Sequence, residues 1–136
     1  MASDSEARYL GVADLLALHQ AVMERTGAAS APLRDEGLLE SAAMRPRMAF
    51  HYERADLIRQ CALLAIGVAQ AQAFLDGNKR TAFAAADVFL RLNGLAFAGD
   101  PLELARQLEA IVTRAGGLDE ATDRFERWLR ERIERL

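Results

Sequence analysis

Hydrophobic residues recur at helical spacing over much of this chain. Within the segment from Val12 to Arg25, the apolar positions fall three or four residues apart, as in an amphipathic helix, at Val12, Leu15, Leu16, Val22 and Met23. Gly27 follows and is expected to end this helix. His19 lies on the same apolar stripe, where a lone histidine is more typical of a buried, hydrogen-bonded packing residue than of a ligand.

A short second helix is predicted after the loop from Gly27 to Pro32. Asp35 is a suitable N-cap, and the apolar side of this helix would consist of Leu38, Leu39, Ala42 and Ala43. Pro46 disfavours helix in the residue before it. We therefore expect the helix to stop near Arg45.

The stretch from Arg47 to Arg54 mixes aromatic residues with charged ones and with His51. It is predicted to be an irregular loop. Such a loop either covers a groove or is a solvated connection held down by its aromatic side chains, and for His51 taken alone we favour the second interpretation.

Two segments in the middle of the chain are apolar over most of their circumference. Asp56 opens the first, which is predicted to run from Leu57 to about Phe74, and the second is predicted from Thr81 to about Asn93, ending at Gly94. Helices of this kind belong in the middle of a bundle. Leu95 to Phe97 is predicted to be a short extended piece.

Two more helices are predicted towards the C-terminus. Between Asp100 and Glu103 a cap, a proline at the first helical position and an acid that can reach back to the cap coincide. This helix should run to about Ala115 and end at Gly116 and Gly117, and Asp119 should open the last one. The apolar stripe of the last helix is Ala121, Phe125, Trp128, Leu129 and Ile133. Two acid–arginine pairs four residues apart lie on its outside, Glu126 with Arg130 and Glu131 with Arg135.

These elements predict an all-α fold, a compact bundle of about six helices without βαβ alternation. With 136 residues, 51% of them hydrophobic, the chain suits a single domain with one packed core. We expect residues 1–8 to be a flexible N-terminus, because they are polar. They also have no apolar core of the signal-peptide type, and no uncharged apolar run reaches the roughly 18 residues that span a bilayer. A soluble cytoplasmic protein without membrane contact is expected.

The net charge and the cysteine content bear on the expected ligands and on the cellular compartment. A net charge of -3 argues against a dedicated nucleic-acid binder, which needs a basic face to neutralise phosphates, although a local basic patch is compatible with it. Cys61 is the only cysteine and cannot form an internal disulfide. Its apolar neighbours predict a buried thiol in a reducing compartment.

A polar turn with one glycine separates the two central helices, and its composition is typical of an anion site. Gly77 permits a tight turn, Asn78 can hold that turn with side-chain hydrogen bonds, and the next helix directs its unpaired first amides towards it. Lys79 and Arg80 place two cations at this positive helix end, a conflict that a negative ligand would relieve. Asp76 supplies an oxygen of the kind that holds magnesium beside nucleotide phosphates. A capped helix corner with exposed charges fits the composition equally well.

The order of residues in this turn carries more information than its composition. Phe74 to Ala82 reads FLDGNKRTA and closely resembles the core motif of the Fic/Doc family in its death-on-curing branch. The usual motif is histidine, any residue, phenylalanine, any residue, aspartate, glycine or alanine, asparagine, lysine and arginine. Weaker likenesses extend along nearly the whole chain, at Tyr9-Leu10, Asp14 to His19, Thr26-Gly27, Leu33 to Ala42, Arg45-Pro46, Phe89-Leu90 and Asn93-Gly94.

The resemblance implies the compact helical Fic fold, with the turn as an anion-binding loop between two central buried helices. Fic proteins proper transfer AMP from ATP to a target hydroxyl, with glycine at the position of Lys79 and a second arginine at that of Phe83. Both departures match the death-on-curing branch, so AMP transfer is less favoured. The branch implies the toxin of a toxin–antitoxin pair, a kinase that transfers the γ-phosphoryl group of ATP to elongation factor Tu and stops translation. It also implies an antitoxin partner, whose tail folds as a helix across the active-site groove.

The resemblance also implies roles for single residues of the turn. Asp76 would hold Mg²⁺, and Phe74 would anchor the loop in the core. The phosphates of ATP would be held by the backbone of Gly77 and Asn78 and the side chains of Lys79 and Arg80. Phosphoryl transfer depends mostly on such positioning and charge stabilisation.

Gln72 stands where the family has its catalytic histidine. An amide is no base near neutral pH, and general base catalysis is typically worth about 10²- to 10⁴-fold, so we expect weakened phosphotransferase activity. Ala71 and Ala73 depart from the usual asparagine and proline, and three adjacent departures indicate natural drift rather than one engineered change. His51 and His19 are the only imidazoles that could replace the base, and neither lies on the turn. The alternative is a catalytically inactive descendant that still binds a nucleotide or an antitoxin helix.

Overall fold

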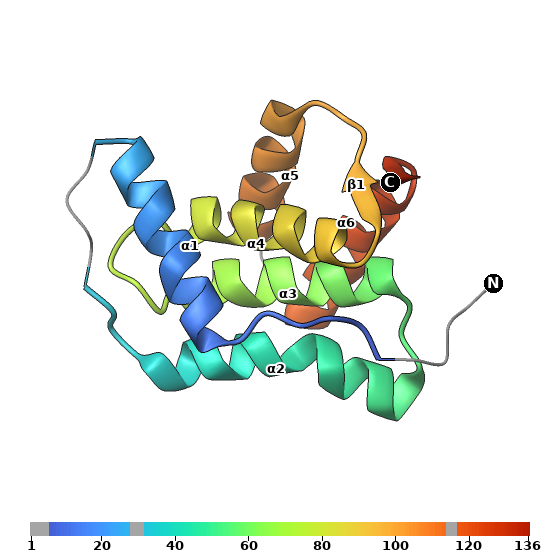
Figure 1. The fold of residues 1–136 in the computed structure, drawn as a ribbon, viewed down its shortest axis with the longest axis horizontal. Coiled ribbons are helices and arrows are strands. Elements are labelled where there is room, and N and C mark those ends of the chain that lie inside the picture. The colour runs from blue at the N-terminus through green and yellow to red at the C-terminus, as the bar shows by residue number, and fades with distance from the viewer. Residues whose placement is uncertain (1–5, 28–31, 114–116) are drawn as a thin grey trace.

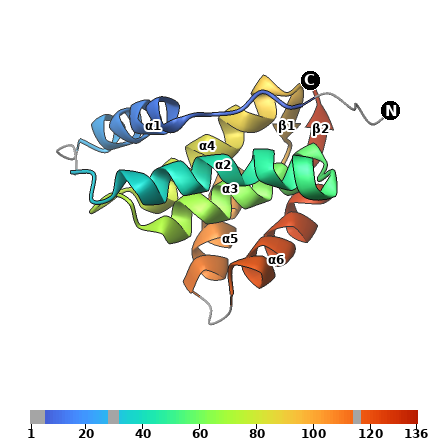
Figure 2. The ribbon, with the colours of Figure 1, turned by 90° about the horizontal axis from the view of Figure 1, so that it is seen from below.

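A computed structural model describes residues 6–27, 32–113 and 117–136 of the chain, and these ranges contain six helices and two short strands. In order, the elements are α1 (Val12–Arg25), α2 (Glu36–Glu53), α3 (Leu57–Ala71), α4 (Asn78–Leu92), β1 (Leu95–Phe97), α5 (Pro101–Thr113), α6 (Leu118–Arg130) and β2 (Ile133–Arg135). The helix α3 packs against α2, α4, α5 and α6 and is the centre of the bundle (Figure 1 and Figure 2). The predicted all-α, six-helix fold is therefore confirmed.

The core is built around α3, in which every residue from Gln60 to Ala69 is buried. Alanines on the facing side of α4 are also buried, so the two helices approach closely. Cys61 lies in this core, where its thiol contacts the carbonyl of Ala86 at 3.6 Å. Burial raises the pKa of the Cys61 thiol, and the charge of Asp87 raises it further. The predicted buried thiol is confirmed.

The prediction that the second helix stops at Arg45 is wrong, because α2 continues through Pro46 to Glu53. Its buried residues, Leu39, Ala42, Ala43, Pro46 and Phe50, form one helical stripe, so burial along α3 outweighs the backbone hydrogen bond that a proline cannot make. The predicted loop from Arg47 to Arg54 is consequently helix. His51 is exposed on α2, and its Nε2 lies 3.0 Å from the carboxylate of Glu6.

The ends of the other helices differ from prediction by a few residues. The helix α3 ends at Ala71, before Phe74, and α4 begins at Asn78, before Thr81. Gly117 takes the N-cap position of α6 that Asp119 was expected to hold.

The C-terminal helix is shorter than predicted. It ends at Arg130, so that Ile133 lies in β2 and pairs with Phe97 of β1 in an antiparallel ribbon. The predicted pair of Glu126 with Arg130 is present at 2.7 Å. Arg135 lies in the strand, so it cannot pair with a residue four positions earlier on a helix.

Three predicted features fall wholly or partly outside the described ranges: residues 1–5 of the N-terminal stretch, residues 28–31 of the first loop, and the end of α5 at 114–116. Arg8 is described, and both its backbone N–H and its carbonyl are hydrogen-bonded to the side chain of Asn93. Within the described ranges, no helix has the length and apolar character needed to cross a membrane.

Candidate active site

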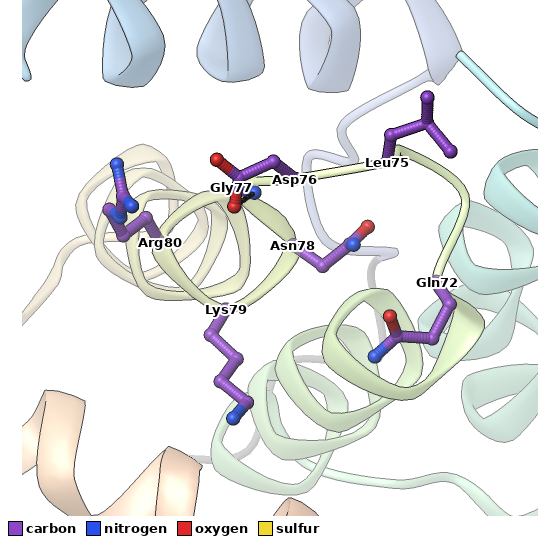
Figure 3. Close-up of a pocket in the computed structure, with 7 residues that line it drawn as sticks. All are labelled: Gln72, Leu75, Asp76, Gly77, Asn78, Lys79 and Arg80. Carbon is purple, nitrogen blue, oxygen red and sulfur yellow. Dashed lines mark hydrogen bonds between the residues drawn. The ribbon is translucent and has the colours of Figure 1, made fainter. Parts of the chain in front are cut away.

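The turn between α3 and α4 forms a pocket of about 290 Å³ (Figure 3). Its lining consists of Gln72, Leu75, Asp76, Gly77, Asn78, Lys79 and Arg80. The structure therefore brings together every residue that the sequence nominated for catalysis, phosphate binding or metal binding.

Asn78 closes the loop with its side chain. Its Oδ1 accepts a hydrogen bond from the backbone N–H of Phe74 at 3.1 Å, and its Nδ2 donates to the carbonyl of Phe74 at 2.8 Å. Both residues are buried, with the ring of Phe74 in the core. The Asn78 amide therefore holds the backbone of the loop, and the backbone N–H of Asn78, in the first turn of α4, is without an intrahelical partner.

Gly77 is required both by backbone geometry and by space. Its φ of +83° lies in the left-handed region, which side chains disfavour. A Cβ atom at this position would lie 2.8 Å from Sδ of Met23 and 3.3 Å from the ring of His19. The N–H of Gly77 donates to Oδ1 of Asp76 at 2.8 Å, which orients that carboxylate.

The first turn of α4 supplies positive charge to the pocket. The first intrahelical bond, from Thr81 N–H to the carbonyl of Gly77, leaves the amides of Asn78, Lys79 and Arg80 without partners within the helix. The ammonium of Lys79 lies 3.9 Å from the carboxylate of Glu109 on α5. The guanidinium of Arg80 donates to the hydroxyl of Thr26 at 3.2 Å. Helix amides and two cations thus surround one small cavity, an arrangement suited to an anion.

The helix α1 braces one side of the loop. Nε2 of His19 lies 2.9 Å from the carbonyl oxygen of Asp76, and the His19 ring stacks on Phe74 with centroids 3.6 Å apart and planes 3° from parallel. The prediction of a buried, hydrogen-bonded packing histidine is confirmed. The sequence did not indicate that its partner is the anion-binding turn.

The segment before α2 braces the other side. Leu33 and Phe74 form an antiparallel bridge, the N–H of Arg34 donates to the carbonyl of Ala73 at 2.6 Å, and that of Leu75 donates to Pro32 at 3.2 Å. The loop is therefore held by two segments that precede it by many residues.

Gln72 is the C-cap of α3 and has a φ of 53°, which is uncommon for a residue other than glycine. Its Nε2 donates to the carbonyl of Ala69 at 3.2 Å, so the amide folds back on its own helix at the edge of the pocket. The residues that line the pocket include neither His19 nor His51. Nothing in the described chain thus favours either histidine as a replacement base.

Asp76 is the single acidic residue in the lining of the pocket. In the described ranges, no group of three or more histidine, cysteine, aspartate or glutamate side chains could hold a metal ion. A metal bound here would consequently need most of its oxygen ligands from a substrate or from water.

A larger, mainly apolar groove of about 620 Å³ adjoins the pocket between α1, α4 and α5. Its apolar lining includes Leu18, Val22, Phe83, Val88 and Leu102. Lys79 and Arg80 line both the groove and the pocket, so a ligand in the groove would lie next to the cations of the turn.

Comparison with known proteins agrees with this architecture. The family model described as the Fic/DOC family matches residues 9–90. The protein "Toxin Doc" of Mycolicibacterium smegmatis is 43% identical over 93 residues, which cover 64% of this chain and 70% of that protein. "Protein kinase doc" of Escherichia phage P1 is 35% identical over 99 residues, which cover 72% of this chain and 77% of that protein.

Proposed function

Because the chain belongs to the Fic/DOC family, we propose that it is the toxin of a toxin–antitoxin pair. In this proposal it transfers the γ-phosphoryl group of ATP to a hydroxyl of a translation factor similar to elongation factor Tu, in the cytoplasm. The observation that carries the proposal is the pocket in which Asp76, Lys79 and Arg80 surround the N-terminus of α4. The name of one relative, "Toxin Doc", supports the role of a toxin, and the name of the other, "Protein kinase doc", supports the reaction class.

The phosphates of ATP would lie on the first turn of α4. The backbone N–H groups of Asn78, Lys79 and Arg80 and the two cationic side chains would bind the phosphate oxygens, where negative charge accumulates during transfer. The hydroxyl oxygen of the target would bond to the γ-phosphorus as the bond to the β–γ bridging oxygen breaks. ADP then leaves with its phosphates held by the same cations.

The donor set of the pocket fits Mg²⁺ that arrives with a nucleotide. Magnesium is commonly held by one or two carboxylates together with phosphate oxygens and water, and Asp76 offers one carboxylate that Gly77 N–H already orients. When bound, the ion would supply positive charge against the phosphoryl group. Free Mg²⁺ should bind weakly, because a single carboxylate is available.

We expect a low rate because of Gln72. Its amide can donate a hydrogen bond to the target hydroxyl but cannot accept the proton, which must pass to solvent. A missing general base typically costs about 10²- to 10⁴-fold. The loose transition state of phosphoryl transfer has little need of an early deprotonation, so residual activity is expected.

The groove favours a second candidate function, that of a binding module. Its apolar lining suits the apolar face of a helix, and Lys79 and Arg80 at its end suit an acidic residue on the same helix. An antitoxin tail bound there would cover the phosphate-binding cations. A catalytically inactive descendant would retain this binding, with an antitoxin or a nucleotide as its ligand, and no nucleic-acid partner is proposed.

Label transfer tests the enzymatic proposal. The chain and its Gln72→His variant are incubated with magnesium, elongation factor Tu and ATP labelled in the γ-phosphate. We expect slow labelling by the chain and labelling faster by about 10²- to 10⁴-fold with the restored histidine. Arg80→Met should abolish labelling, whereas Arg91→Met, which removes an exposed cation at the other end of α4, should not.

The outcome distinguishes the candidates. No labelling by the chain or by Gln72→His rejects phosphoryl transfer to this target. The mass added to the target separates phosphoryl transfer from AMP transfer, which is the less favoured reaction. A calorimetric titration that finds neither ATP nor an antitoxin tail bound would reject the binding module.

A further inference from the structure

The C-terminal half of α1 and its C-cap contact the anion-binding turn at several points. His19 contacts the backbone of Asp76, Met23 approaches Gly77, and Thr26 accepts a hydrogen bond from Arg80. In Figure 3 the turn from Leu75 to Gly77 passes beneath this helix. The helix α1 and its C-cap contribute no residue to the lining of the pocket, but they contact three residues of that lining, Asp76, Gly77 and Arg80.

The contact of His19 is the most constrained of the three. The side chain is 3% exposed, and its ring is held flat on Phe74, so its orientation is set by packing. Its Nε2 faces a carbonyl oxygen at 2.9 Å. Since a carbonyl only accepts hydrogen bonds, Nε2 must carry the proton.

This hydrogen bond acts on a particular peptide unit. The carbonyl of Asp76 and the N–H of Gly77 belong to one planar trans peptide and point in opposite directions. Holding the carbonyl towards α1 therefore turns the N–H away from α1, where it donates to Oδ1 of Asp76 at 2.8 Å. The bond that His19 makes and the bond that holds the Asp76 carboxylate therefore involve the same peptide unit.

We propose that His19 is a positioning residue, which through the Asp76–Gly77 peptide sets the orientation of the Asp76 carboxylate and so the affinity of the turn for a magnesium–nucleotide complex. The identity of this ligand rests on the proposed function, but the orientation of the peptide does not. The competing explanation is that His19 only fills space between α1 and Phe74.

Two substitutions at His19 separate the effect of the stacked ring from the effect of its hydrogen bond. His19→Phe keeps an aromatic ring on Phe74 and removes the donor, whereas His19→Gln keeps a nitrogen donor and removes the ring. Leu15→Ala is the matched control, because Leu15 is fully buried on the same helix and its aliphatic side chain makes no hydrogen bond to the turn. It should reduce stability without changing the peptide.

The first measurement is calorimetric titration with magnesium and a non-hydrolysable ATP analogue. Loss of one neutral hydrogen bond should raise the Kd of His19→Phe by about 2- to 10-fold, with His19→Gln closer to the parent chain and Leu15→Ala unchanged. An equal rise in His19→Phe and Leu15→Ala would show that the residue acts through packing alone and would overturn the proposal.

The second measurement is nuclear magnetic resonance of the free protein and needs no ligand. In the parent chain, the ring nitrogen shifts should report a proton on Nε2, and His19→Phe should move the amide resonance of Gly77 more than Leu15→Ala does. A neutral ring protonated on Nδ1 would overturn the proposal, even if no His19 variant folds. If the parent chain binds no nucleotide, the proposed function fails. The shift of the Gly77 amide resonance in the His19 variants still tests the role of His19, because it needs no ligand.

Discussion

The side-chain amide of Asn78 reproduces the hydrogen bonds of a backbone partner, because it accepts from the N–H of Phe74 and donates to its carbonyl. The five residues from Phe74 to Asn78 are thereby closed into a ring that includes Asp76 and Gly77.

Asn78→Ala should consequently be costly. It leaves a buried N–H and a buried carbonyl without partners, and we expect the free energy of unfolding to fall by about 2–4 kcal/mol. Asn93→Ala is the matched control: Asn93 also bonds backbone groups through its side-chain amide, but it is partly exposed at the end of α4. Urea denaturation should show the larger loss for Asn78, and equal losses would contradict this account.

Gly77→Ala and Gly94→Ala separate backbone strain from steric conflict. Both glycines have left-handed φ values, +83° and +80°, but a Cβ at Gly94 would meet no atom within 4 Å. Gly94→Ala should cost about 1–2 kcal/mol, the price of the conformation alone. Gly77→Ala should cost more, since Met23 must move, and the added substitution Met23→Ala should recover part of this excess. A thermal melt that ranks Gly94→Ala lower than Gly77→Ala in stability would refute the steric argument.

Asp56 should make stability depend on pH under acidic conditions. Arg130 donates to its carboxylate at 2.8 and 3.2 Å, which lowers the pKa of Asp56. Burial raises this pKa, and the hydrogen bond from the N–H of Arg59 at the start of α3 lowers it, so the net shift is downward. Because the pKa of Asp56 is lower in the folded state than in the unfolded state, the ionised carboxylate stabilises the fold at pH values above the unfolded pKa of about 3.9. This contribution is lost as the pH falls from that value through the folded-state pKa.

Asp56→Asn should therefore lower stability at neutral pH and flatten its decline between about pH 4 and more acidic values. Asp100→Asn is the control, because Asp100 caps α5 through Leu102 N–H and forms no ion pair among the described residues. Denaturant midpoints measured across this range test the expectation. An unchanged slope for Asp56→Asn would count against it.

The thiol of Cys61 should be inert in the folded protein. Complete burial raises its pKa, so the reactive thiolate is scarce and inaccessible. We expect alkylation by iodoacetamide to be negligible without denaturant and rapid in urea, as followed by mass spectrometry. Rapid modification of the native protein would mean that the core between α3 and α4 opens readily.

The sequence predicted the central helices because their apolar character extends around the whole helix. It failed at α2, where the local rule that Pro46 disfavours helix in the residue before it takes no account of the stripe from Leu39 to Phe50 that packs on α3. It failed again at Ile133, which continues the apolar spacing of α6 yet pairs with Phe97 in a ribbon. In both cases a partner distant in sequence decides the local structure.

The candidate site likewise has a part that the local sequence predicts and a part that depends on residues distant in the chain. The residues that line the pocket are almost contiguous in the chain, so the motif could identify them together. The braces supplied by His19 and Leu33 come from segments whose likeness to the family is weaker, and their role depends on how α1 and the start of α2 are placed. Periodicity predicts that His19 is buried but not which backbone it contacts.

His19 and Asp76 are 57 positions apart in the chain, so the order of the turn is conditional on the docking of α1. This helix lies at the side of the bundle, whereas α3 and α4 share its centre (Figure 1). Detaching α1 should need less free energy than unfolding the core. The Gly77 amide should then exchange its hydrogen together with α1, and on heating the protein should lose its ligand affinity before it loses most of its helical circular dichroism.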